Sequence, residues 1–237
     1  MTPLLYAHRG LWNHAPQNSV ASIRAAIEAG ADGVEVDLRL TSDYQIVLCH
    51  DPTFFGREIA ESRLDELQRL APPPLRLATL KEAFGQRPQI RTNLEIKPQL
   101  VDRAGFMVDV AYAEISSIWP QKDIARFVEV SSFQEAIIEQ FAVSYPEVPR
   151  FLLVDRYTSV AKKIATAKSL GCVGINLEWT RATRSNLRRA ADHGLLVGVW
   201  TVDSPRRAQS LSYSPVSHII TNKVVQLRKV LPPNGRS

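Results

Sequence analysis

The sequence predicts an α/β fold, a (β/α)8 TIM barrel that carries a β-hairpin arm and a short excursion after its second strand. Short apolar strand patterns alternate with longer helical patterns, which is typical of a parallel sheet with crossover helices. There are nine strand patterns, whereas a closed parallel barrel contains eight. Only residues 41–44 separate the second pattern from the third, and a parallel neighbour needs a crossover of at least about a dozen residues. The third pattern is therefore expected to run antiparallel to the second.

The expected elements follow one another in a regular order. The strands are short runs rich in Val, Ile, Leu and aromatic residues, and they cover residues 4–8, 33–40, 45–50, 92–97, 127–133, 150–155, 173–179, 195–202 and 217–222. The helices are longer patterns that cover residues 18–29, 101–118, 134–142, 158–169, 183–193 and 204–211. The helix at 183–193 is the most clearly amphipathic, with a basic outer face and a stop at Gly194. Removing 45–50, the returning arm of the hairpin, leaves the eight strands of a barrel.

One stretch, residues 55–84, interrupts the alternation of strands and helices. It contains a helical segment, a break at Pro72–Pro74 and a second helical run that starts near Thr79. We interpret it as an excursion of the barrel at about 52–80, within a single domain that covers residues 1–237.

The composition predicts a globular protein without a membrane span. Hydrophobic residues make up 45% of the chain, but no apolar stretch reaches the roughly 18 residues that a membrane span requires. Residues 1–6 are too short for a signal peptide, so we expect a cytoplasmic protein. Cys49 and Cys172 show no metal-type spacing and are expected to be buried thiols.

The net charge of +5 is compatible with nucleic acid, an anionic membrane surface or a phosphate-bearing small molecule as partner. No cluster of aromatic and basic residues of the kind that binds single-stranded nucleic acid is present. We therefore expect no nucleic-acid partner.

Charged residues are concentrated where the first three barrel strands end, which is the end that carries the active site in such barrels. They are His8, Arg9, Glu35, Asp37, Glu95 and Lys97. Residues two apart share a strand face, so the three carboxylates should converge. Their mutual repulsion would raise their pKa values unless a cation compensates, and oxygen ligands suit Mg²⁺ or Ca²⁺. Ion pairs that close the barrel could explain single residues, but they do not explain the whole set.

The hairpin places a second histidine near this cluster. If Asp43 and Tyr44 form the tip, facing residues have numbers that sum to about 87, and His50 lies opposite Asp37. His8 and His50 would then flank a metal site and act as a general acid and base near neutral pH.

Two histidines do not supply enough catalysis by themselves. Each contributes a factor of roughly 10² to 10⁴, so a metal ion, Arg9 and Lys97 would have to stabilise developing negative charge. Phosphoryl transfer from a phosphodiester fits this requirement and the basic chain.

Several motifs resemble those of the glycerophosphodiester phosphodiesterase family, in order and over nearly the whole chain. They are AHRG (7–10), PQNS (16–19), GVEVDLRLT (33–41), VLCHD (47–51), NLEIK (93–97), SSF (131–133), VGVWTVD (197–203) and IITN (219–222). The first half of this series is the specific part.

The resemblance implies a barrel enzyme that hydrolyses glycerophosphodiesters to glycerol 3-phosphate and an alcohol with a divalent cation. It implies roles for eight residues: His8 and His50 as the acid-base pair, Glu35, Asp37 and Glu95 as metal ligands, Arg9 and Lys97 as phosphate contacts, and Trp200 in the substrate pocket. It also implies a route in which the glycerol hydroxyl of the substrate attacks first and water then opens a cyclic phosphate.

The chain departs from the family pattern at three places. Gln17 precedes Asn18 where the family usually has Glu-Asn, which removes a negative charge from the edge of the site. The hairpin tip has Tyr44 in place of the usual glycine, so it is less permissive for positive φ and presents Tyr44 outward. The stretch after His50 reads PTFFGRE, and because the excursion forms one wall of the site, the leaving alcohol is open.

Other functions remain open at this point. The same barrel could act on a lysophospholipid, a sphingomyelinase D-like substrate or a sugar phosphodiester, and the pair Phe54–Phe55 is a faint signal for a lipid. A catalytically dead barrel that binds a phosphate ligand is a further alternative, which Gln17 alone supports.

Overall fold

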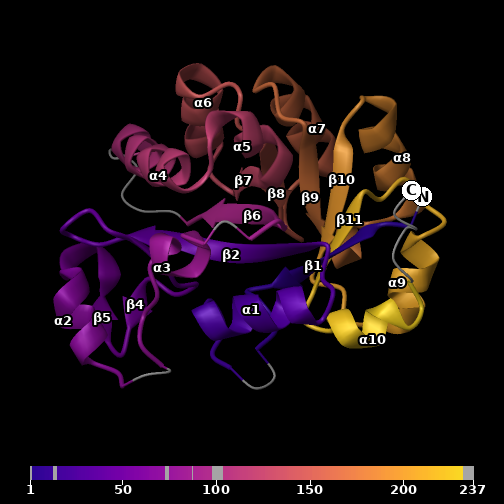
Figure 1. Ribbon diagram of the computed structural model, residues 1–237. Coiled ribbons are helices and arrows are strands. Elements are labelled where there is room, and N and C mark those ends of the chain that lie inside the picture. The colour runs from indigo at the N-terminus through magenta and orange to yellow at the C-terminus, as the bar shows by residue number, and fades with distance from the viewer. Residues whose placement is uncertain (1, 13–14, 73–74, 87, 98–103, 232–237) are drawn as a thin grey trace.

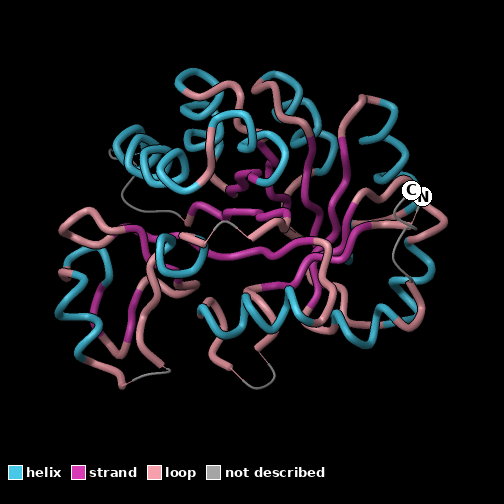
Figure 2. Tube along the Cα trace, viewed as in Figure 1, coloured by secondary structure: helices cyan, strands magenta, loops and turns pink. Residues whose placement is uncertain are grey.

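The computed structural model describes residues 2–12, 15–72, 75–86, 88–97 and 104–231, and it confirms the predicted barrel. Eight parallel strands form a closed ring with helices around its outside (Figures 1 and 2). The strands of the ring are β1 (Leu4–His8), β2 (Gly33–Leu40), β6 (Arg91–Ile96), β7 (Val128–Ser132), β8 (Arg150–Val154), β9 (Gly174–Glu178), β10 (Leu196–Trp200) and β11 (His218–Thr221). The pairing of β1 with both β2 and β11 closes the ring.

The helices lie in the predicted places with two additions. They are α1 (Val20–Glu28), α2 (Leu64–Arg69), α3 (Leu80–Phe84), α4 (Ala104–Ile118), α5 (Gln121–Phe127), α6 (Glu135–Ser144), α7 (Val160–Ser169), α8 (Arg184–Asp192), α9 (Pro205–Leu211) and α10 (Val224–Arg228). Two of them, α5 and α10, have no counterpart among the predicted patterns because they have only 7 and 5 residues and show too little periodicity. The predicted start of the helix at 101–118 lies outside the described residues.

The arm is antiparallel to β2, as predicted, but its register differs by one residue. Strand β3 (Ile46–Leu48) places Leu48 opposite Leu38, so the facing numbers sum to one less than expected and Cys49, not His50, continues opposite Asp37. The tip is wider than a two-residue turn: Thr41 and Gln45 close it, and the Thr41 hydroxyl donates to the Asp43 carboxylate at 2.7 Å.

Two further predictions on the arm have definite outcomes. Tyr44 adopts the positive φ of 63° at which glycine is usual, and its ring is exposed and packs edge-on against Phe106. Cys172 is a buried free thiol as expected, whereas Cys49 is free but only half-buried.

The excursion begins with a small hairpin of β4 (Thr53–Phe54) and β5 (Arg57–Glu58), followed by a 3-10 turn (Ile59–Glu61) and α2. Thr79 caps α3 by accepting a hydrogen bond from the Glu82 amide, so the second helical run starts where it was predicted. Of the predicted proline break, residues 73 and 74 lie outside the described residues. These segments lie beside the arm, away from β8–β11 (Figure 1).

Alternating side chains of β2 explain how an entirely buried strand carries acids. Val34, Val36 and Leu38 belong to the apolar cluster that the surrounding helices cover, while the intervening Glu35 and Asp37 face the inside of the ring. The strand is apolar on its outer face and charged on its inner face. Within the described residues, none of the helices has the length and apolar character needed to cross a membrane.

Candidate active site

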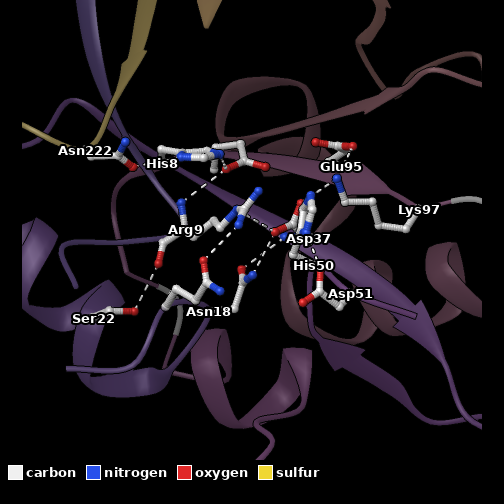
Figure 3. A network of polar contacts seen from close by, with 12 residues as sticks. His8, Arg9, Asn18, Ser22, Asp37, His50, Asp51, Glu95, Lys97 and Asn222 are labelled. Atoms are coloured by element: carbon white, nitrogen blue, oxygen red, sulfur yellow. Dashed lines mark hydrogen bonds and ion pairs between the residues drawn. The ribbon is translucent and has the colours of Figure 1, made fainter. Parts of the chain in front are cut away.

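A small pocket of about 130 Å³ lies at the carboxyl ends of the strands, where the sequence places the site. It brings together seven of the predicted site residues: His8, Arg9, Glu35, His50, Glu95, Lys97 and Trp200. Asp37 lies directly behind the pocket with no exposed surface. Figure 3 shows the labelled members of this set, which come from the ends of β1 and β6, from β2 and from the end of the arm, pointing toward one another, and Trp200 comes from β10.

The three predicted metal ligands form one acidic cluster. One carboxylate oxygen each of Glu35, Asp37 and Glu95 lies within 4.8 Å of the others. The parallel register explains this proximity, because His8 lies opposite Glu35 and Asp37 lies opposite Glu95 across neighbouring strands. Two strands, β2 and β6, therefore deliver the three acids to one level of the barrel.

Glu35 has a buried carboxylate whose surroundings suit a metal ligand. Its Oε1 atom is buried and has no hydrogen-bond partner among the described residues. Burial, together with the nearby carboxylates of Asp37 and Glu95, raises the pKa of Glu35 well above its usual range. Burial likewise raises the pKa of Glu95 to about 7. A divalent cation would remove this penalty, so the donor set fits a hard metal ion.

Asp37 is held in the opposite electrostatic state. Although burial opposes ionisation, Lys97 and Arg9 hold the pKa of Asp37 below its usual range. Lys97 Nζ lies 2.9 Å from Asp37 Oδ1, and Arg9 Nε lies 3.1 Å from Oδ2. The Asn18 side-chain amide also donates to Oδ2 at 2.7 Å. Asp37 therefore stays ionised and holds both cations beside the pocket.

His8 is held by an amide that is itself held by a carboxylate. Its Nδ1 lies 2.8 Å from Asn222 Oδ1, and the Asn222 amide nitrogen donates to Asp203 at 2.8 Å. Because that nitrogen is used, the oxygen of Asn222 faces the ring, and His8 must carry its proton on Nδ1. Burial, followed by the charge of Arg9, lowers the pKa of His8 to about 4. The neutral ring therefore presents a free Nε2, which lies 3.9 Å from Glu35.

His50 reaches the pocket by a different route from the one that the register predicted. Simple strand alternation would send it to the outer face, but β3 ends at Leu48 and the chain turns. The Arg39 guanidinium donates to the carbonyl of His50 at 2.5 Å and fixes this turn. The His50 ring is 40% exposed, and its Nδ1 lies 2.7 Å from Asp51 Oδ1. Burial lowers the pKa of His50, while the hydrogen bond to Asp51 opposes that shift and favours the protonated ring.

Gln17 and Asn18 lie at the edge of the site. Arg9 donates to Gln17 Oε1 at 2.8 Å. The side-chain oxygen Oδ1 of Asn18 accepts from the backbone amide of Asp37 at 3.1 Å. Asn18 therefore supports Asp37 through both ends of its amide, and it adopts a positive φ of 56° to do so. Both residues also line a second, larger cavity next to the site.

The structure adds residues to which the sequence patterns assign no role. Phe133 packs edge-on against Trp200 with ring centroids 5.6 Å apart, and the Trp200 indole donates to the carbonyl of Asn176 at 3.0 Å. Asn222, which donates to Asp203, orients His8 from the other end of the sequence. Asn222 is recognisable as a strand-end residue, but its contact with His8 spans 214 positions and leaves no local signal.

The fold and this pocket define the class of protein: a TIM-barrel hydrolase with an acidic cluster suited to a divalent cation, flanked by basic residues suited to phosphate. The sequence matches the glycerophosphoryl diester phosphodiesterase family over residues 8–226. The chain therefore belongs to this family and is a phosphoric diester hydrolase of the type that acts on glycerophosphodiesters.

Individual relatives agree with this assignment. The Bacillus subtilis protein YhdW, which carries a glycerophosphodiester phosphodiesterase name, is 27% identical over 92% of this chain and 93% of its own length. A glycerophosphodiester phosphodiesterase from Parabacteroides distasonis superposes with a TM-score of 0.86 at 24% identity, with 97% of both chains covered. An Oleispira antarctica phosphodiesterase, solved with the product sn-glycerol-3-phosphate, gives a TM-score of 0.85 at 21% identity over 98% of each chain. At these identities the solved structures support the fold.

Proposed function

We propose that this protein hydrolyses glycerophosphodiesters to glycerol 3-phosphate and an alcohol by divalent-cation-dependent catalysis with His8 and His50 as the proton-transfer pair. The observation that carries the proposal is the open, buried oxygen of Glu35 between two other carboxylates and beside His8. Buried acceptors in folded proteins are almost always hydrogen-bonded, so an unpartnered oxygen between two carboxylates supports a ligand site.

Glu35, Asp37 and Glu95 are the residues that would hold the cation, either Mg²⁺ or Ca²⁺. When bound, the cation would neutralise charge on the phosphate and stabilise the negative charge that develops on its oxygens. Arg9 and Lys97 line the same pocket and supply two further positive charges for the phosphate oxygens.

The two histidines differ in the proton that each can handle. His8, with its proton on Nδ1, accepts the proton of the attacking hydroxyl on Nε2 as the oxygen–phosphorus bond forms. His50, paired with Asp51, gives a proton to the oxygen of the leaving alcohol as the phosphorus–oxygen bond breaks. The attacking hydroxyl belongs to water or to the glycerol part of the substrate. In the second case, water then opens the cyclic phosphate and the net reaction is unchanged.

The test is a phosphorus NMR assay of purified protein with glycerophosphocholine, glycerophosphoethanolamine and a lysophospholipid, in Mg²⁺, Ca²⁺ or chelator. We expect turnover that chelator abolishes and that added Mg²⁺ or Ca²⁺ restores, with any cyclic intermediate visible as a separate resonance. Full turnover in chelator would overturn the metal requirement. Tight binding of the diester with no turnover would favour a phosphate-binding barrel.

A further inference from the structure

A second cavity of about 390 Å³ adjoins the candidate active site. It is three times the volume of the phosphate pocket and lies within the size range of small-molecule sites. Its apolar lining comes from the arm and from the excursion: Leu48, Phe54, Phe55, Leu75, Leu77 and Ala78. Among the described residues, His50 is the lining residue that the two cavities share.

The polar groups around this cavity already have partners. Gln17 is an uncharged amide that accepts from Arg9, and the Asp51 carboxylate is engaged by His50. The Arg76 guanidinium pairs with Glu82 and also donates to Gln68. Among the lining residues that the structure describes, the cavity therefore offers mainly apolar surface, and its one carboxylate, Asp51, is paired with His50 through Oδ1.

Two apolar side chains at its rim are unusually open to solvent. Phe55, at the tip of the β4–β5 turn, is 62% exposed, and Leu75 is 49% exposed. Phe54 and Phe55 pack edge-on with ring centroids 4.9 Å apart, which forms an aromatic wall. A ligand that covered these side chains would remove apolar surface from water, at about 25 cal/mol per Å².

We propose that this cavity is the subsite for the leaving alcohol and that it selects alcohols with an uncharged aliphatic chain. The proposal rests on the proposed function. The leaving oxygen must lie at His50 to receive its proton, and His50 lines both cavities whereas His8 lines only the smaller one. The glycerol phosphate part then occupies the smaller pocket, beside Trp200 and Phe133. When the phosphorus–oxygen bond breaks, the proton from His50 completes the alcohol, which is already held in the apolar cavity.

The first test uses a series of glycerol 3-phosphate diesters whose leaving alcohols are ethanol, butanol, hexanol and choline. We expect kcat/KM to rise by up to about fourfold for each methylene that enters the cavity, which is the equivalent of 0.8 kcal/mol. The choline diester should be poorer than the butyl diester. A flat chain-length series, or a preference for choline, would contradict the proposal.

The second test measures binding without chemistry. Ethyl, butyl and hexyl phosphate are titrated calorimetrically into the protein in Mg²⁺, and affinity should rise with chain length. The Leu75→Ser and Phe55→Ser variants should each flatten this rise, whereas Tyr213→Ser, a control at a side chain 85% exposed and remote from both cavities, should not.

The two tests separate the subsite from the reaction. If no diester is hydrolysed but alkyl phosphates bind more tightly as the chain lengthens, the proposed function and the leaving-alcohol role fail, and the cavity stands only as a site that binds alkyl chains. If diesters are hydrolysed and both series are flat, the subsite is overturned and the function stands. The wild-type binding series decides the matter even if one variant does not fold.

Discussion

Two buried glutamates at barrel strand ends show how differently the two halves of the ring are built. Glu178, at the end of β9, accepts a hydrogen bond from the Thr180 amide at 2.9 Å and a second from the Thr180 hydroxyl. Glu35, on β2, has a buried oxygen without a partner among the described residues and faces two other acids. Glu178 thus closes its own loop, whereas Glu35 belongs to a cluster whose oxygens could hold a cation.

Two histidines repeat this contrast. His218, at the start of β11, stacks on Tyr6 at 4.8 Å and meets Phe151 edge-on, so its ring is part of the packing inside the barrel. His8, at the end of β1, opens into the pocket and has a fixed hydrogen-bond partner behind it. The type of residue does not reveal a site by itself. What matters is whether the ring packs inside the barrel, as in His218, or lines the pocket, as in His8.

The largest effect should follow loss of the histidines. His8→Ala and His50→Ala should each lower kcat by roughly 10² to 10⁴, because each removes one proton transfer. His193→Ala is the control, because His193 lies at an exposed helix end and its Nδ1 contacts the carbonyl of Arg189. This variant should keep kcat within about twofold of the wild-type value. Steady-state rates on the best diester measure this, and full activity in either site variant would contradict the assignment.

Next in size is the pair of glutamates. Glu35→Gln should weaken the apparent affinity for Mg²⁺ by at least about 100-fold, since even residues that only support a ligand cost 10- to 100-fold. Glu178→Gln should leave that affinity unchanged and cost about 1 kcal/mol of stability, because an uncharged amide oxygen accepts the Thr180 hydrogen bonds more weakly than a carboxylate does. Metal titrations of activity and thermal unfolding separate the two results. Equal metal affinity in both variants would contradict the assignment of Glu35, and not Glu178, as a metal ligand.

A smaller effect is expected for the support of His8. Asp203→Asn removes the carboxylate that fixes Asn222, so the Asn222 amide can turn and His8 loses its preferred tautomer. We expect kcat to fall by about 10- to 100-fold with little change in KM. Asp155→Asn is the matched control, because Asp155 likewise accepts hydrogen bonds after a barrel strand, at the amides of Tyr157 and Thr158, but among the described residues it accepts none from a site residue. A rise in KM with unchanged kcat would show that Asp203 only shapes the nearby loop and does not position His8.

The last prediction concerns folding stability and its dependence on the pKa of His218. Burial lowers the pKa of His218 from 6.5 to about 3, so the unfolded chain binds more protons between these values. This group therefore contributes stability above pH 6.5 that is lost as pH falls toward 3, by at most about 1.4 kcal/mol per pH unit. His218→Gln should reduce the loss of stability over this range, as measured by denaturant unfolding at several pH values. An unchanged slope of stability against pH in this variant would show that His218 does not cause the loss of stability.

The sequence was sufficient for the ring, the arm and the convergence of three acids, because these follow from period-two patterns and short connections. The position of His50 could not be derived, since Thr41 and Asp43 build a wider turn and the register moves by one residue. His50 nevertheless lines the pocket because Arg39 fixes the chain beyond β3, a contact that strand alternation does not encode. The support of His8 by Asn222 was also out of reach, because it joins the two ends of the chain.

His50 joins the two cavities, and this has a consequence for how the protein can diversify. The acids belong to strands of the ring, whereas the apolar cavity takes much of its lining from the arm and from residues 53–55 and 75–78. Mutations in those loops can change the accepted alcohol while the reaction centre stays intact. On this proposal, the barrel supplies the reaction centre and the excursion supplies the alcohol specificity. Grafting the excursion onto another member of the family is a direct way to transfer that specificity.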